Sequence, residues 1–253
     1  MMNITLKNQT ILVTGASRGI GAAIALALSE AGAKLAIHYH RQENQATALL
    51  QKLNPDCRMF QANLEDTADV QKLFEEVVDS MGNLIGIVNN AGVAMSCAVE
   101  GSDQDWLEGW QKIMNVNTTA LGLLCKKAIQ HMIKNDGGRI VNISSRAAFR
   151  GDTADYMGYA ASKGAVVALT RSIARAYGKQ NICAFNIAPG FVRTDMAQEF
   201  MDQYGENFAL NDIALNELTQ PKDIAPMVLL LLSGLSDHAT GATIDMNAGS
   251  YVH

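Results

Sequence analysis

Short apolar runs rich in β-branched residues alternate along the chain with longer segments whose apolar residues recur every three or four positions. The runs have the pattern of buried parallel strands and lie at residues 10–14, 34–39, 58–61, 84–88, 139–143, 182–187 and 242–246. The longer segments predict helices at residues 22–31, 66–81, 106–133, 159–173 and 223–232, the third of them interrupted around residues 115–117. This alternation predicts an α/β fold with a doubly wound parallel sheet of the Rossmann type. Ligands are then expected at the carboxyl ends of the strands.

Length and composition favour a single domain over residues 1–253. The chain has 253 residues, 48% of them hydrophobic, and no stretch is rich enough in Gly, Pro or Ser to form a linker. The N-terminus lacks the pattern of a secretory signal, and the longest apolar run, residues 228–232, is too short to span a bilayer. The four cysteines lie far apart, as expected for reduced, mostly buried thiols. We therefore expect a cytoplasmic location.

Charge and histidine spacing argue against several kinds of partner. The formal net charge is −5, and no basic cluster is longer than the pair Lys126–Lys127. A nucleic acid or a membrane surface is therefore not expected as the main partner. None of the five histidines has the spacing of a metal site, so we predict no structural or catalytic metal.

A glycine turn follows the first strand and opens the first helix. Gly15, Gly19 and Gly21 are spaced G-x-x-x-G-x-G, which differs from the usual G-x-G-x-x-G. Glycines let the backbone approach a pyrophosphate, and the helix N-terminus supplies free N–H groups and the positive end of a dipole. A glycine turn alone is a weak signal, but its flanking strand and helix favour a dinucleotide site.

The end of the second strand bears on the choice of dinucleotide. NAD sites place an acidic residue there for the ribose hydroxyls. Here Tyr39, His40 and Arg41 occupy the region, and the first acidic residue is Glu43. Arg18 in the glycine turn can reach the same side, and two guanidinium groups without a carboxylate suit a 2′-phosphate. We therefore predict NADP(H) in preference to NAD(H); the alternative is that Arg41 only begins a solvated helix.

Tyr159 and Lys163 lie four residues apart in a segment that is predicted to be helical, so they share one helix face. A free tyrosine titrates near ~10, and a neighbouring cation favours the phenolate. Such a phenol can give a proton to a carbonyl or take one from an alcohol. The alternative is a packed ring beside a solvated amine, and the pair alone does not decide between the two.

Six motifs appear in order: TGASRGIG at 14–21, NNAG at 89–92, Asn117 in a long helix, ISS at 143–145, YAASK at 159–163 and PGFVRTDM at 189–196. Together they resemble the classical short-chain dehydrogenase/reductase family, most closely its 3-oxoacyl-carrier-protein reductases. The resemblance implies a catalytic tetrad of Asn117, Ser145, Tyr159 and Lys163. In it Tyr159 is the acid/base, and Ser145 hydrogen-bonds the substrate carbonyl. Lys163 lowers the tyrosine pKa and binds the nicotinamide ribose, and Asn117 holds a water of a proton relay.

Two assignments have competitors. Ser144 and Ser145 point to opposite faces of a strand, and the resemblance selects Ser145. Tyr156 also falls on the Lys163 side of the helix, but only Tyr159 has the lysine four residues on. Ser145 and Tyr159 are fourteen residues apart, one more than expected, so the loop at 146–158 is predicted to carry an insertion.

The resemblance also implies a set of cofactor contacts, which comprises Gly15, Ser17, Arg18, Gly19, Ile20, Gly21, Tyr39, Arg41, Asn63, Leu64, Asn90, Ala91, Gly92, Tyr159, Lys163, Pro189, Gly190, Val192 and Thr194. Two positions depart from the family pattern. Asn63 stands where an aspartate is usual, although an amide can still donate and accept at the adenine. Residues 247–249 read Asn-Ala-Gly where paired glycines are common.

A substrate lid is expected at about 191–220. It mixes apolar residues with acids: Met196, Phe200, Met201, Tyr204, Phe208 and Leu210 with Asp195, Glu199, Asp202, Glu206 and Asp212. Its apolar side suits a medium carbonyl compound; the alternative is a helix that only packs on the body. The turns at 135–138 and 178–181 contain no arginine, which leaves docking of an acidic carrier protein open.

These features predict an NADPH-dependent carbonyl reductase acting on a 3-oxoacyl-thioester-like or similar ketone. One alternative is an alcohol or sugar dehydrogenase that runs oxidatively, and another is a non-catalytic NADP-binding sensor or scaffold. By resemblance, residues 227–232 and the last strand imply a homotetramer.

Overall fold

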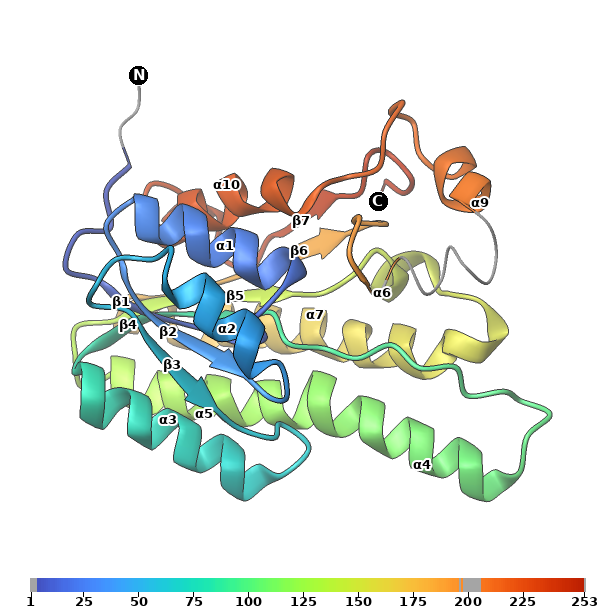
Figure 1. Cartoon of the computed structure of the whole chain (residues 1–253), viewed down its shortest axis with the longest axis horizontal. Helices are drawn as coiled ribbons and strands as arrows, with labels where there is room; N and C mark the ends of the chain where they lie inside the picture. The colour runs from blue at the N-terminus through green and yellow to red at the C-terminus, as the bar shows by residue number, and fades with distance from the viewer. Residues whose placement is uncertain (1–3, 196, 198–205, 253) are drawn as a thin grey trace.

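A seven-stranded parallel sheet runs through the centre of the computed structural model, which describes residues 4–195, 197 and 206–252 (Figure 1). The strand order is β3-β2-β1-β4-β5-β6-β7. The strands are β1 Thr10–Val13, β2 Lys34–Tyr39, β3 Arg58–Gln61, β4 Leu84–Asn89, β5 Gly138–Ile143, β6 Ile182–Pro189 and β7 Thr243–Met246. Each predicted run forms a strand, and the doubly wound parallel sheet is confirmed.

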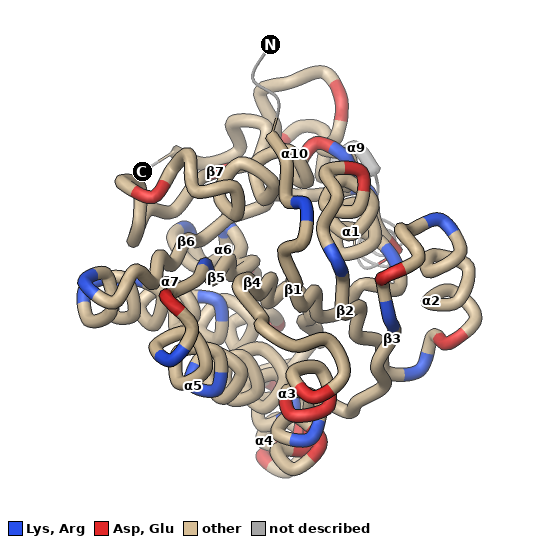
Figure 2. Tube along the Cα trace, turned by 90° about the vertical axis from the view of Figure 1, so that its left-hand side faces the viewer, with Lys and Arg blue, Asp and Glu red and all other residues tan. Residues whose placement is uncertain are grey.

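Helices cover both faces of the sheet (Figure 2). They are α1 Gly19–Glu30, α2 Glu43–Leu50, α3 Thr67–Met81, α4 Asp103–Met114, α5 Leu121–Met132, α6 Ala147–Arg150, α7 Met157–Tyr177, α9 Glu206–Asn211 and α10 Pro221–Leu232. α1, α2 and α10 lie on one face, and α3, α4, α5 and α7 on the other. Because side chains of a strand alternate, Ile11 and Val13 join the α1–α10 core while Leu12 joins the core under α3, α5 and α7.

The strand order places a topological switch beside β1. β1 pairs with β2 on one side and with β4 on the other, so the chain winds away from β1 in both directions. In sheets of this kind a crevice opens at the carboxyl ends of the strands next to the switch. The glycine turn after β1 and the Asn89–Asn90 end of β4 lie beside each other at that crevice.

The long third helix is interrupted as predicted. α4 ends at Met114, a π-helical segment spans Asn115–Ala120, and α5 continues from Leu121. π-turns inside helices are rare and occur often at functional sites. Here the wide turn places Asn117 in the interior, with no exposed surface.

The connection between β5 and α7 contains the predicted insertion region. It folds into the short helix α6 and a 3₁₀ turn over Ala154–Tyr156 before α7 begins at Met157. Tyr159 and Lys163 are both in α7, one turn apart. The four cysteines are buried and unpaired, as the sequence predicts. No helix in the described part of the chain is long and apolar enough to cross a membrane.

The described part of the expected lid packs as a small satellite core. Ala197, Ala209 and Leu218 are buried in it, with Phe191 and Leu210 against them. Of the residues expected to give the lid its apolar side, Met196, Phe200, Met201 and Tyr204 lie outside the described residues.

Candidate active site

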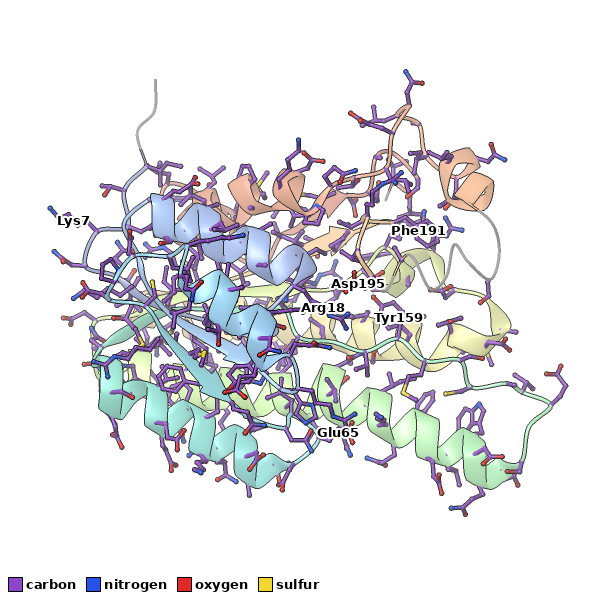
Figure 3. All side chains as sticks on the ribbon, in the orientation of Figure 1. Lys7, Arg18, Glu65, Tyr159, Phe191 and Asp195 are labelled. Carbon is purple, nitrogen blue, oxygen red and sulfur yellow. The ribbon has the colours of Figure 1, made fainter. Side chains whose placement is uncertain are left out.

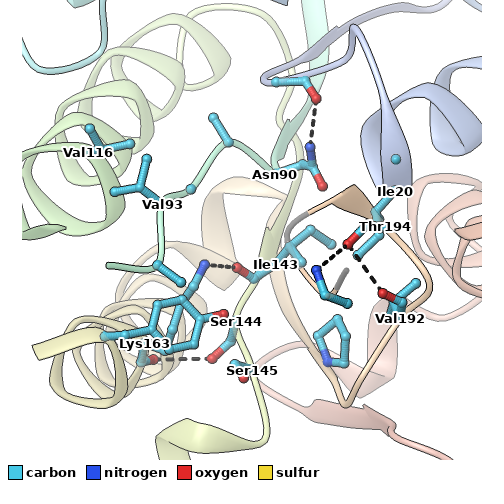
Figure 4. Close-up of a pocket in the computed structure, with 18 of the residues that line it drawn as sticks. Ile20, Asn90, Val93, Val116, Ile143, Ser144, Ser145, Lys163, Val192 and Thr194 are labelled. Atoms are coloured by element: carbon cyan, nitrogen blue, oxygen red, sulfur yellow. Dashed lines mark hydrogen bonds between the residues drawn. The ribbon is translucent and has the colours of Figure 1, made fainter. Parts of the chain in front are cut away.

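A cavity of about 940 Å³ opens at the carboxyl ends of the strands (Figure 4). Its walls come from the segments that follow β1, β2, β3, β4, β5 and β6, and from α7. Every residue predicted to bind the cofactor lines it, except Gly21. Of the predicted tetrad, Ser145, Tyr159 and Lys163 line the cavity, whereas Asn117 lies behind its wall. The structure therefore brings together residues that are up to 179 positions apart, from Gly15 to Thr194.

The glycine turn is shaped for close approach of another group. Gly15 has a φ of +62° and Gly19 a φ of +57°, in the left-handed region that favours glycine. A Cβ on Gly15 would lie 2.9 Å from the Cα of Ala91. α1 starts inside the turn, at Gly19, so its unpaired N–H groups face the cavity region where a pyrophosphate would bind. The cradle and the helix end fit a dinucleotide.

Asn90 fastens this turn to the end of β4. Its Nδ2 donates to the carbonyl oxygens of Thr14 at 2.9 Å and Gly15 at 3.0 Å. The Thr14 hydroxyl in turn accepts from the backbone N–H groups of Asn90 and Ala91, at 3.0 and 3.1 Å. Asn90 therefore orders the turn itself, beyond any contact with a ribose.

His38, in β2, is a functional residue that sequence reasoning missed. It is 2% exposed; its Nδ1 accepts from the Gly15 N–H at 3.1 Å, and its Nε2 lies 3.2 Å from the Ala62 carbonyl oxygen. Burial lowers the pKa of His38 to about 4, so the ring is neutral and Nε2–H donates to Ala62. His38 thus ties the glycine turn to the segment that precedes Asn63. Its signal in the sequence is a titratable residue inside an otherwise apolar strand.

The far end of the cavity, around the carboxyl end of β2, is lined by Tyr39 and Arg41. Glu43, the first acidic residue after β2, does not line it. The acids that do line the cavity on the nearby walls are ion-paired: Glu65 with Lys112 at 3.5 Å, and Asp195 with Arg18 (Figure 3). Arg41 is exposed at the mouth of this end of the cavity. The lining therefore suits a negatively charged group on the adenosine ribose.

Asn63 and Leu64 line the same end, after β3. The Asn63 Oδ1 accepts from the Glu65 N–H at 3.1 Å, and the Asn63 N–H donates to Asp69 at 3.0 Å. The asparagine that departs from the family pattern therefore keeps the acceptor oxygen that orders this loop.

The two serines after β5 have different partners. The Ser144 hydroxyl donates to the Lys163 carbonyl oxygen at 3.1 Å, which fixes β5 to α7 (Figure 4). The Ser145 Oγ accepts from the Ala147 N–H at 3.1 Å, at the start of α6. Its hydrogen bond with Tyr159 acts to lower the pKa of that residue. Ser145 is the serine beside the phenol, as the sequence predicts.

The electrostatics at Tyr159 differ from the expectation that Lys163 lowers its pKa. Burial raises the pKa of Tyr159 to about 12, and the hydrogen bond with Ser145 opposes this. The Lys163 Nζ lies 5.7 Å from the centre of the Tyr159 ring and donates to the Ile143 carbonyl oxygen at 2.9 Å. Burial lowers the pKa of Lys163 to about 8. Desolvation is thus the largest effect on the pKa of both groups, and Tyr159 holds its proton at neutral pH.

Asn117 acts on the wall of the cavity. Its Oδ1 accepts from the Val93 N–H at 2.8 Å and its Nδ2 donates to the Val93 carbonyl oxygen at 2.9 Å and to the Ser162 hydroxyl at 3.0 Å. A Cβ on the neighbouring Gly92 would lie 3.3 Å from both Asn117 Oδ1 and Lys163 Nζ. The amide therefore holds the Gly92–Val93 backbone against the lysine.

The end of β6 and the segment after it line the side of the cavity where the resemblance implies contacts with the nicotinamide. Pro189, Gly190, Val192 and Thr194 line it, and a Cβ on Gly190 would lie 2.9 Å from Asn247. Ala248, where the family commonly has glycine, has a φ of +53°, and its carbonyl oxygen accepts from the Ala214 N–H at 2.8 Å. This alanine is strained by roughly 1 kcal/mol, and its carbonyl orders the segment between α9 and α10.

Comparisons with known proteins show the family of the chain. The family model described as enoyl-(acyl carrier protein) reductase matches residues 15–251. The chain is 34% identical over 248 residues to 3-oxoacyl-[acyl-carrier-protein] reductase FabG of Staphylococcus aureus, with 96% of this chain and 98% of that protein covered.

Two solved structures are similar over nearly their whole length. A short chain dehydrogenase from Burkholderia cenocepacia in complex with NADP has a TM-score of 0.89 and 30% identity, with 97% of this chain and 98% of that chain covered. A blue fluorescent protein from a metagenomic library in complex with NADPH has a TM-score of 0.89 and 34% identity, with 99% and 100% covered. The chain therefore belongs to the short-chain dehydrogenase/reductase family and is an NAD(P)-dependent oxidoreductase.

Proposed function

We propose that the protein is an NADPH-dependent carbonyl reductase that converts a ketone, of the 3-oxoacyl-thioester type or a similar small to medium compound, into an alcohol. The observation that carries the proposal is the Tyr159 phenol, hydrogen-bonded with Ser145 in a cavity that also contains a dinucleotide-type glycine turn. The FabG name of the Staphylococcus relative supports the 3-oxoacyl class.

The cofactor assignment to NADP(H) is supported by the solved relatives in complex with NADP and NADPH. In this chain the glycine turn would hold the pyrophosphate and Asn63–Leu64 the adenine. Arg41 with Tyr39 would hold the 2′-phosphate, together with Arg18 once it leaves Asp195. Asn90, Ala91 and Gly92 would pass the adenosine ribose. Lys163 would hold the nicotinamide ribose.

When bound, NADPH supplies a hydride to the carbonyl carbon. Tyr159 gives its proton to the carbonyl oxygen, and a pKa of about 12 means that the phenol is protonated and ready to donate at neutral pH. The Ser145 hydroxyl donates a hydrogen bond to the same oxygen and stabilises the charge that develops there. The protonated phenol is the form that carbonyl reduction requires, whereas alcohol oxidation requires the phenolate.

Lys163 and Asn117 have supporting roles in the proposal. Lys163, with a pKa of about 8, can return a proton to Tyr159 after each turnover. The Asn117 side chain is hydrogen-bonded to Val93 and Ser162. We therefore propose that Asn117 positions Gly92 and Lys163. The water relay through Asn117 stays a prediction.

The test is a steady-state assay of NADPH oxidation against a panel of ketones, with Tyr159→Phe as the paired variant. We expect turnover in the wild type and a loss of roughly 10²- to 10⁴-fold in the variant, the usual contribution of a general acid. A wild type that binds NADPH but reduces no ketone would favour the non-catalytic sensor. Faster turnover of alcohols with NADP⁺ at neutral pH would favour the oxidative dehydrogenase.

The cofactor preference has a separate test. Arg41→Ala should weaken NADPH binding roughly 10- to 100-fold and leave NADH binding within a few-fold, because only NADPH carries the 2′-phosphate. Equal losses for both cofactors, measured by titration of nicotinamide fluorescence, would contradict the 2′-phosphate role.

A further inference from the structure

The cavity wall next to Ser145 contains two arginines that the cofactor does not need. Arg146 directly follows Ser145, and Arg150 ends α6; both line the cavity on the side of Tyr159 and Phe191. Gly151, Asp152 and Thr153 continue the same wall. The glycine turn and Arg41 belong to the opposite end of the cavity, so these two guanidinium groups face the substrate side.

Arg146 is held as a buried cation. Its side chain is 9% exposed, its guanidinium carbon lies 4.5 Å from the centre of the Phe191 ring, and its Nη1 forms an ion pair with Asp212. Stacking on Phe191 and the pair with Asp212 keep the charge in place although burial lowers its pKa. Burying a guanidinium in the wall of the cavity that also contains Ser145 and Tyr159 costs desolvation free energy, which argues that its charge is used.

Arg150 shares the same carboxylate. Its Nη1 donates to both Asp212 oxygens, at 3.0 and 2.9 Å, and its side chain is 35% exposed. Within the described part of the chain, Asp212 is the only carboxylate at ion-pair distance from either arginine. Each guanidinium has five N–H donors, and those bonded to described residues are on Nη1 alone.

Asp212 itself does not line the cavity, whereas both arginines do. Asp152, the other acid of this wall, is exposed and accepts from the Thr153 N–H at 2.8 Å. Two cations therefore line the substrate side of the cavity, with the paired carboxylate of Asp212 behind them and the carboxylate of Asp152 beside them. Planar donors of this kind are suited to a carboxylate.

We propose that Arg146 and Arg150 form a subsite for a carboxylate, so that the natural substrate is a free oxo acid whose ketone lies at Ser145 and Tyr159. This rests on the proposed function and narrows it, because a thioester attached to a carrier lacks the carboxylate. Asp212 holds the two guanidinium groups in place and competes with the substrate for their remaining charge.

The test compares 3-oxo acids with their methyl esters in the NADPH-oxidation assay, for the wild type, Arg150→Gln, Asp212→Asn and Arg171→Gln. Arg150 is chosen because it is the more exposed of the pair. Arg171 is exposed on α7, does not line the cavity and controls for loss of a surface charge. We expect the ratio of kcat/KM for acid over ester to fall roughly 10- to 100-fold in Arg150→Gln and to rise in Asp212→Asn. Arg171→Gln should keep the wild-type ratio.

Opposite changes in the acid-over-ester ratio of kcat/KM, a fall in Arg150→Gln and a rise in Asp212→Asn, distinguish a substrate subsite from a structural role. If the arginines only fasten the segment that carries Asp212, Arg150→Gln and Asp212→Asn will change acid and ester together and in the same sense. That result, or a wild type that reduces the esters but not the acids, would overturn the subsite and leave the proposed reductase intact. If none of the ketones tested leads the wild type to oxidise NADPH, the proposed reductase is overturned instead.

Discussion

Gly21 shows how tightly single residues define the cofactor turn. A Cβ at this position would lie 2.3 Å from the Gly15 carbonyl oxygen and 2.6 Å from the Asn90 Nδ2. Both atoms already belong to the hydrogen bonds that hold the turn. Gly21 therefore lets α1 approach the turn closely, although it does not line the cavity.

His38 makes the stability of this unit depend on pH. The neutral ring is favoured in the folded state, where its pKa is about 4, whereas a solvated histidine titrates near 6.5. The unfolded chain thus binds the additional proton first as the pH falls. The contribution of neutral His38 to the free energy of unfolding is fully present above pH ~6.5 and is lost as the pH falls from there to ~4. At pH 5 the loss is about 2 kcal/mol.

The measurement is urea unfolding at pH 7 and pH 5 for the wild type and His38→Gln. Glutamine can still accept from the Gly15 N–H but does not titrate. We expect the wild type to lose about 2 kcal/mol more than the variant over this range. Parallel losses in the two proteins would rule out His38 as the titrating group.

At the scale of elements, the π-turn between α4 and α5 is the device that brings Asn117 inside. The Asn117 side-chain amide forms hydrogen bonds with both the N–H and the carbonyl oxygen of Val93. It therefore pairs with the Val93 backbone as a neighbouring strand would. Through Gly92 the same loop contacts Lys163. A helix defect is therefore coupled to the position of Lys163.

Replacing the Asn117 side-chain amide should uncouple the π-helical turn from the position of Lys163. In Asn117→Leu the Val93 N–H and carbonyl lose their partners, and each buried unpaired group costs ~1–3 kcal/mol, so we expect a loss of roughly 2–5 kcal/mol with reduced turnover. Asn115→Leu is the matched control in the same turn, because among the described residues the Asn115 side chain accepts one bond, an exposed one from Gln111 at 2.7 Å. It should change stability by no more than ~0.5 kcal/mol. Equal effects in the two variants, measured by chemical unfolding, would contradict the role of the Val93 bonds.

Helices and strands could be predicted from the sequence where the local pattern of apolar and polar residues determines them. The apolar runs gave the strands because parallel strands are buried on both faces, and Asn115–Asn117 marked the break in the long helix because asparagines are poor helix formers. α6 and the 3₁₀ turn at Ala154–Tyr156 were not predicted, since they depend on long-range contacts such as those of Arg146 and Arg150 with Asp212. The same contacts explain why the arginine pair was missed.

At the scale of the whole molecule, the sheet order accounts for the meeting of distant motifs. Parallel strands put the ends of β1, β4, β5 and β6 on one edge, so the motif positions could be grouped from the sequence. The protonation states of the site residues could not be predicted from the sequence. The spacing of Tyr159 and Lys163 predicted their proximity, but the depth of burial that raises one pKa and lowers the other is a property of the assembled cavity.

The expected homotetramer also belongs to this scale. β7 is an edge strand with its residues partly exposed, and Met227, Leu229 and Leu230 of α10 are partly exposed beside it. We predict that sedimentation will give four times the mass of one chain, and that Leu230→Glu will lower it because a charge would enter the contact. A wild type that sediments as one chain would refute the assembly.

The central claim is that Tyr159 donates the proton in a cavity that binds NADPH, and single-turnover kinetics test it most directly. The enzyme–NADPH complex is mixed with a ketone, and the loss of nicotinamide fluorescence is followed for the wild type and Tyr159→Phe. The account predicts that the variant binds NADPH within a few-fold of the wild type but reacts roughly 10²- to 10⁴-fold more slowly. Equal rates in the two proteins would contradict it.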